Sequence, residues 1–156
     1  MRQRQPQAGF TLLELLVVLV LAGITAAVVG GGAQSFMERS RYHQVVRDVA
    51  SQLSRARALC VQEGRSVVVT YQPNSRQLIV DGTLRLEIPE PLVVRWTPVQ
   101  RIGQKANPAL GQPVFVFNAD GGAIGGQFMV ARGTQGVVFR VNWLLGTVEQ
   151  AVAAVS

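Results

Sequence analysis

Cysteine and histidine are almost absent from this chain of 156 residues, which contains one of each, Cys60 and His43. A single cysteine cannot form an intrachain disulfide bond, and the two residues together are too few for a zinc cluster. A site built on several histidines is likewise excluded, and we expect His43 to have a surface or packing role rather than a catalytic one. We expect Cys60 to be a small buried apolar residue rather than a reactive thiol.

Charged residues are also scarce, at 15% of the chain, and none occurs between Leu15 and Ala33. The formal net charge is +6, and it falls to +4 (13 basic minus 9 acidic residues) if the first nine residues, which include Arg2 and Arg4, are removed. A mildly basic protein permits a nucleic-acid or anionic partner but does not require one.

The uncharged stretch Leu15–Ala33 is long enough to cross a bilayer as a helix, and a short basic segment precedes it. A secretory signal peptide cleaved near 25–27 and a plain membrane anchor are both consistent with this pattern. Neither explains Glu14, because a carboxylate within an apolar run costs about 2.5–3.5 kcal/mol at the middle of a membrane.

The segment Gly9-Phe10-Thr11-Leu12-Leu13-Glu14 followed by an apolar run resembles the N-terminal signal of type IV pilins and type II secretion pseudopilins. The resemblance implies that residues 1–9 are a leader, which a prepilin peptidase removes by cutting between Gly9 and Phe10. Phe10 would then become the methylated N-terminus of the mature chain, and Glu14 its fifth residue.

Glu14 would lie about 6 Å along a helix from the new N-terminal amine of Phe10. A subunit that joins a filament can place its amine beside the Glu14 of a neighbour, so that each buried charge gains a partner. We therefore expect Glu14 to act in assembly. The alternative is that its side chain only extends to the membrane interface.

One long helix is predicted from about residue 10 to residue 63, because an apolar stripe continues beyond the membrane segment and Gly64 is a natural stop. We expect residues 10–33 to form a transmembrane and assembly helix, and residues 34–63 to form an amphipathic helix. The stripe consists of Tyr42, Val46, Val49, Leu53, Ala56 and Cys60.

Residues 64–156 predict a β-rich head, so the fold class is α+β, with the long helix packed on antiparallel strands. The Gly- and Pro-containing segment 103–113 predicts a loop. The eight expected strands are 66–71, 77–80, 83–88, 92–97, 114–118, 127–131, 137–142 and 145–150.

Four segments of the head, Phe115–Ala123, Gly125–Gln127, Gly136–Val141 and Leu145–Val148, resemble the minor pseudopilin H group of type II secretion systems. This resemblance implies a structural subunit, not an enzyme, near the tip of a pseudopilus that helps export folded proteins through the outer membrane. It implies a single-pass protein of the bacterial inner membrane with its head in the periplasm.

The same resemblance implies several partners: other minor pseudopilins, the major pseudopilin, the prepilin peptidase, the inner-membrane assembly platform and the lipid bilayer. No cofactor is implied. The closest alternative is a type IV pilus minor pilin that primes assembly or binds DNA, because the two groups share a head domain. An enzyme or binding domain exported by an ordinary signal peptide is a more distant alternative.

Two further features of the head were considered as ligand-binding sites, and neither is specific enough to predict a ligand. Asn118 and Asp120 offer too few oxygen ligands for a metal site, and the glycines of 121–126 lack the Gly-Lys-Ser/Thr ending of a phosphate-binding loop. A basic group with an interleaved aromatic residue could contact nucleic acid, but a solvated face is favoured. This group consists of Arg95, Trp96, Arg101 and Lys105.

Overall fold

The computed structural model describes residues 11–99 and 111–154, without the side chains of 28–35. The chain divides into two compact units, Met1–Ser40 and Arg41–Ser156, and each is described by itself. We call the second unit the head.

Helix α1 extends from Leu12 to Glu63 and contributes to both units. It begins at a capping residue, because the backbone N–H of Glu14 donates to Oγ1 of Thr11 at 3.3 Å. It ends at Gly64, whose φ of 62° is easily adopted only by a residue without a Cβ. The prediction of one long helix ending at residue 63 is confirmed, and Phe10 lies outside the described residues.

The apolar stripe of the head part of α1 is buried as the sequence predicted. All six of its residues are 9% exposed or less, and Val49, Leu53, Ala56 and Cys60 are fully buried. A repeat of three and four residues places these side chains on one face of the helix, so that a single layer of strands can cover them.

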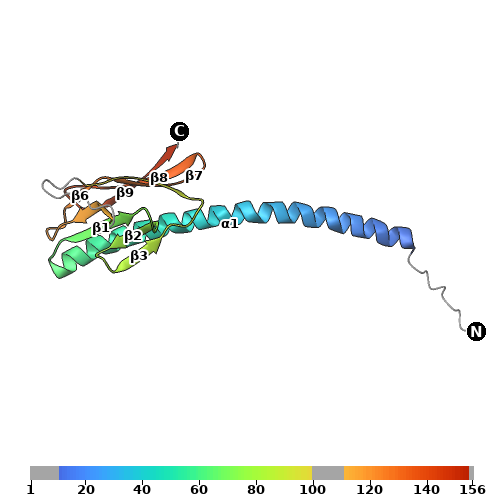
Figure 1. Ribbon diagram of the computed structural model, residues 1–156, viewed down its shortest axis with the longest axis horizontal. Coiled ribbons are helices and arrows are strands. Elements are labelled where there is room, and N and C mark those ends of the chain that lie inside the picture. The colour runs from blue at the N-terminus through green and yellow to red at the C-terminus, as the bar shows by residue number, and fades with distance from the viewer. Residues whose placement is uncertain (1–10, 100–110, 155–156) are drawn as a thin grey trace, which may run out of the picture. The chain divides into compact units, whose positions relative to one another are not determined.

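Nine strands follow α1 in the described part of the head, and all their pairings are antiparallel. Figure 1 shows them gathered alongside the last turns of the helix. The predicted α+β class is thereby confirmed. The strands are β1 (Val67–Gln72), β2 (Gln77–Val80), β3 (Leu84–Glu87), β4 (Val93–Thr97), β5 (Gln112–Phe117), β6 (Ala123–Gly125), β7 (Gln127–Arg132), β8 (Gln135–Val141) and β9 (Val148–Ala154).

Three predictions about the strands were wrong. The glycine-rich segment after residue 120 contains the short strand β6, which pairs with β5. The predicted loop 103–113 ends early, because Gln112 and Pro113 already belong to β5, and its residues 103–110 lie outside the described part. The last strand begins at Val148 rather than at residue 145, because Trp143–Leu145 form a turn.

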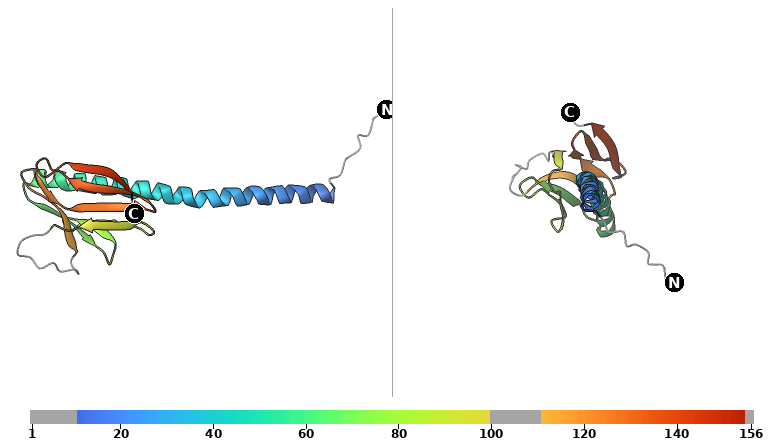
Figure 2. Two further views of the ribbon diagram at one scale, coloured as in Figure 1. Left: turned by 90° about the horizontal axis from the view of Figure 1, so that it is seen from above. Right: turned by 90° about the vertical axis from the view of Figure 1, so that its right-hand side faces the viewer.

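The strands form two sheets, with the orders β3-β2-β1-β5-β6 and β4-β7-β8-β9. Figure 2 shows both sheets beside the part of α1 that belongs to the head. The chain passes from the first sheet to the second between β3 and β4, and again between β6 and β7, at Gly126. A Cβ on Gly126 would overlap the carbonyl oxygen of Thr97, so a glycine is required where the two sheets meet.

A single core joins the helix to both sheets. Its largest fully buried side chains are four phenylalanines, with Phe115 and Phe117 from one sheet and Phe128 and Phe139 from the other. These side chains belong to the same buried cluster as the helix stripe. The stripe is therefore the surface that both sheets share.

An ion pair connects the end of α1 to the turn after β2. The guanidinium of Arg65 donates to both carboxylate oxygens of Asp81, at 2.8 and 2.5 Å, and to Glu63 at 2.6 Å. The hydrogen bonds from Arg65 lower the pKa of Asp81 below its ordinary value of 3.8. The charged form of Asp81 is therefore favoured in the folded head.

Replacing Leu53 by Ala tests the shared stripe. Because Leu53 is fully buried among both sheets, Leu53→Ala should lower the free energy of unfolding of the head by about 2–5 kcal/mol. Urea unfolding of the full chain in detergent can be followed by the fluorescence of Trp96, which packs on Tyr71. The exposed neighbour Ser54, changed to Ala, is the control. Equal stability of the two variants would contradict the assignment.

The Asp81 pair predicts a pH dependence of stability. Because the folded-state pKa is lowered, the pair stabilises the head above about pH 4, and this contribution is lost as the pH falls through the folded-state value. Asp81→Asn keeps a side chain that tolerates the positive φ at this position but removes the charge. The urea midpoints of the two proteins should differ at pH 6, and this difference should shrink as the pH falls below about 4. A constant difference would contradict the role of the charge.

Candidate functional site

The first half of α1 presents apolar side chains that nothing in its own unit covers. Every side chain from Thr11 to Ala27 is exposed, including Leu12 at 88% and Leu19 at 70%. Burying a single leucine side chain contributes about 1.5–3 kcal/mol, so a surface of this size favours contact with lipid or with other apolar helices.

In the part of the chain that the structure describes, no helix is both long enough and apolar enough to cross a membrane.

Glu14 is the one charged residue between Leu12 and Ala27, and it lies in the first turn of the helix. With Thr11 as the cap, it occupies the third helical position, where a carboxylate interacts favourably with the helix dipole and unpaired N–H groups. The sequence analysis missed this capping role, although Thr and Glu three residues apart before an apolar run are its signal.

The predicted processing residues, Gly9 and Phe10, lie outside the described residues. Cleavage between them stays a prediction.

The predicted nucleic-acid group is only partly described. Arg95 is exposed on β4, whereas Trp96 points to the opposite face, where its ring lies 4.8 Å from that of Tyr71 and its Nε1 donates to Gln112. Adjacent residues of a strand face opposite sides, so Trp96 and Arg95 do not share a surface. Arg101 and Lys105 lie outside the described residues, and the group stays a prediction.

The remaining candidates have structural surroundings. Cys60 is fully buried, burial raises the pKa of its thiol, and Sγ donates to the carbonyl of Arg57. His43 is exposed on α1. Oδ1 of Asp120 accepts from the N–H of Gly122 at 3.0 Å, which shapes a turn. Within 11–99 and 111–154, no three His, Cys, Asp or Glu side chains are grouped to hold a metal ion.

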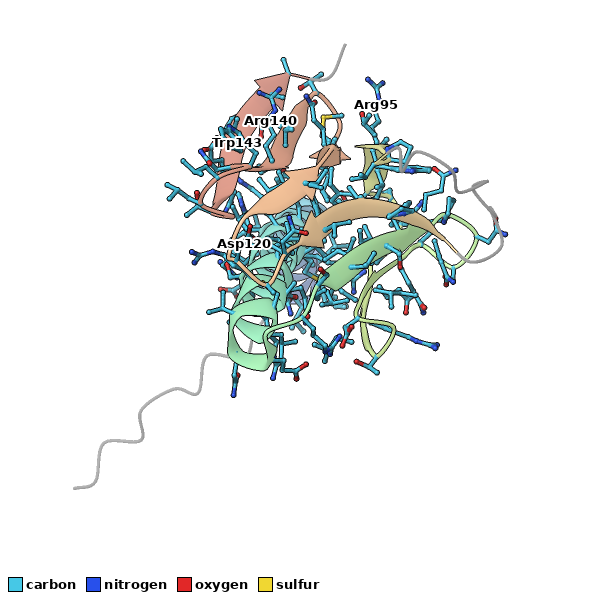
Figure 3. The ribbon with its side chains drawn as sticks, turned by 90° about the vertical axis from the view of Figure 1, so that its left-hand side faces the viewer. Arg95, Asp120, Arg140 and Trp143 are labelled. Atoms are coloured by element: carbon cyan, nitrogen blue, oxygen red, sulfur yellow. The ribbon has the colours of Figure 1, made fainter. Side chains whose placement is uncertain are left out.

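The β8–β9 turn, Asn142–Thr147, is a surface feature that the sequence analysis missed. Trp143 is 76% exposed, Leu144 62% and Leu145 56%. Figure 3 looks onto the end of the head at which α1 ends and places Trp143 and Asp120 on turns there. Asn142 before the apolar residues and Gly146 after them are turn residues, and this was the signal available in the sequence.

Two family models match the chain. The prokaryotic N-terminal methylation motif matches residues 4–30, and the type II transport protein GspH matches residues 45–145. The second match covers α1 from residue 45 onward and the strands from β1 to β8. No solved structure matches the chain.

Curated relatives of two kinds are similar to the chain. The type II secretion system core protein G of Klebsiella michiganensis is 30% identical over 94 residues, 53% of this chain and 66% of the relative. The same protein of Pectobacterium carotovorum is 31% identical over 90 residues, 51% of this chain and 58% of the relative. A fimbrial protein of Pseudomonas aeruginosa is 34% identical over 77 residues, 49% of each chain. The chain thus spans about half to two thirds of these relatives.

The methylation motif falls on the uncovered apolar half of α1, and the GspH match falls on the head. The N-terminal motif indicates anchoring at the inner membrane. The chain belongs to the type II transport protein GspH family, and it is a pseudopilin, a structural subunit rather than an enzyme.

Proposed function

We propose that this chain is a minor pseudopilin near the tip of the type II secretion pseudopilus, where it helps export folded proteins through the outer membrane. The observation that carries this proposal is the pairing of a family head with a helix whose apolar side chains from Leu12 to Ala27 are all exposed. Such a helix is stable only when lipid or neighbouring helices cover it, so the chain is built to be inserted and assembled.

The first proposed step in the maturation of the subunit takes place at its N-terminus. The prepilin peptidase cuts between Gly9 and Phe10, and the segment 10–33 holds the protein in the inner membrane as a single-pass anchor with the head in the periplasm. The new amine of Phe10 then pairs with Glu14 of a neighbouring subunit. This pairing sets the axial register between subunits, because a desolvated charge without its partner is costly.

The proposed partners follow from the two surfaces of the molecule. The uncovered half of α1 meets the lipid bilayer before assembly, and the helices of the major pseudopilin and of other minor pseudopilins after it. The inner-membrane assembly platform receives the anchored subunit. The head carries net positive charge, so copies of it repel one another. This agrees with a place near the tip rather than with a fibre built from this chain.

A type IV pilus minor pilin that primes pilus assembly or binds DNA is the second candidate. The similarity to a fimbrial protein over 77 residues favours it. The exposed Arg95 would belong to a DNA-binding surface in that case, together with Arg101 and Lys105.

Deleting the gene separates the two candidates. We expect a secretion defect, with folded cargo retained in the periplasm, and normal surface motility and DNA uptake. The measurement is cargo activity in the medium against activity in the periplasm, with the gene restored in trans as the control. Normal secretion with lost motility or DNA uptake would favour the pilin instead.

Two substitutions of Glu14 separate its charge from its capping role. Glu14→Gln keeps a side chain that can cap the helix but removes the charge, and Glu14→Ala removes both. If the charge pairs with a neighbour's amine, both variants should lower secretion at least about tenfold. N-terminal sequencing should still find Phe10 first in each.

The outcome that would contradict the pairing is wild-type secretion by the Gln variant with a defect in the Ala variant, since that result needs only the cap. Glu38→Ala, on the same helix beyond the apolar segment, is the control.

A further inference from the structure

The β8–β9 turn displays three large apolar side chains on a rigid backbone. Oδ1 of Asn142 accepts from the N–H groups of Leu144 and Leu145, at 3.1 Å each. The carbonyl oxygen of Asn142 accepts from Gly146 at 2.8 Å, and its N–H donates to Thr147 at 2.9 Å. These bonds fix the shape of the turn from within.

Neighbouring elements hold the same turn from outside. Nε of Arg57, on α1, donates to the carbonyl of Leu145 at 3.1 Å. The N–H of Ala123, on β6, donates to the carbonyl of Trp143 at 3.0 Å. Gly146 lies so close to the carbonyl of Gly121 that a Cβ would overlap it. The backbone polar groups are thus used inside the head, while the side chains of Trp143, Leu144 and Leu145 remain outside.

We infer that Trp143, Leu144 and Leu145 form the site at which this head docks onto the head of a different pseudopilin, one that carries net negative charge. The inference rests on the proposed function and adds to it a surface and a class of partner. A rigid, exposed tryptophan flanked by leucines suits such a site, because little conformational entropy is lost when it is buried.

The charge of the head selects the partner. Residues 41–156 contain 12 basic and 7 acidic residues, which gives a net charge of +5. A second copy of this chain would bring a like charge to the interface, whereas an acidic head would be attracted to it. The contact is therefore between unlike subunits.

The position of the turn argues against a lipid surface. Arg57 and Val61, in the last turns of α1, lie beside the β8–β9 and Asn118–Gly122 turns. Val61 is about 30 Å along the helix from Arg41, where α1 begins its part of the head. The turn therefore lies at the opposite end of the head's part of α1 from Arg41, the end to which the apolar segment is joined.

Photocrosslinking in cells identifies the occupant directly. A photoreactive phenylalanine analogue replaces Trp143 in the full-length chain, expressed with the intact secretion system. We expect a crosslink to another pseudopilin with an acidic head, identified by mass spectrometry. The same analogue at Val152, which is 86% exposed on β9, should give no such product. A crosslink to a second copy, to lipid only, or to no pseudopilin would overturn the inference.

Substitution tests the contribution of the side chain. Trp143→Ala should weaken binding of the full-length chain in detergent to the crosslinked partner about 30-fold, as expected for a central interface tryptophan. Val152→Ala, which shortens another exposed apolar side chain, should bind like the wild type. Because Trp143 is outside the core, both variants should melt at the wild-type temperature. Wild-type binding by Trp143→Ala would overturn the inference.

The failure of this inference can be told apart from the failure of the proposed function. If deletion of the gene abolishes secretion while Trp143→Ala secretes normally, the docking site is wrong and the pseudopilin function stands. If deletion leaves secretion normal, the proposed function is wrong, and the docking site falls with it.

Discussion

The buried stripe from Tyr42 to Cys60 is the contact on which the head depends. It lies on one face of α1, and both sheets meet on it through the phenylalanines of β5, β7 and β8. Neither sheet alone encloses a core, so the helix is the common support that holds nine short strands as one body. Gly126 allows the close approach of the two sheets that this arrangement requires.

The same helix carries a second apolar surface that the chain cannot cover by itself. From Leu12 to Ala27 every side chain is exposed, and Glu14 is the one charge among them. The apolar stripe in the second half of the helix is thus buried within the subunit, whereas the apolar side chains of the first half can be buried only in a bilayer or against other subunits. The head thus has a buried core of its own, whereas the first half of the helix presents an apolar surface that favours contact with lipid or other helices.

Most large apolar side chains in the described part of the head are buried, and the β8–β9 turn is the place where three exposed ones are consecutive. There the backbone is fixed by bonds to Arg57 and Ala123, while Trp143 and the leucines face solvent. A turn that only connected two strands would need no such side chains. Combined with a basic head, this surface gives the subunit a means of choosing an unlike neighbour.

The sequence by itself determined the helix, its stripe, its end at Gly64 and most strands, because these depend on local periodicity and on one residue's backbone freedom. Only the tertiary structure decided that β6 pairs with β5, that β9 begins at Val148, and that Trp143 is exposed. Pairing and exposure depend on what lies opposite a residue in space, and residues distant in the chain supply that neighbour.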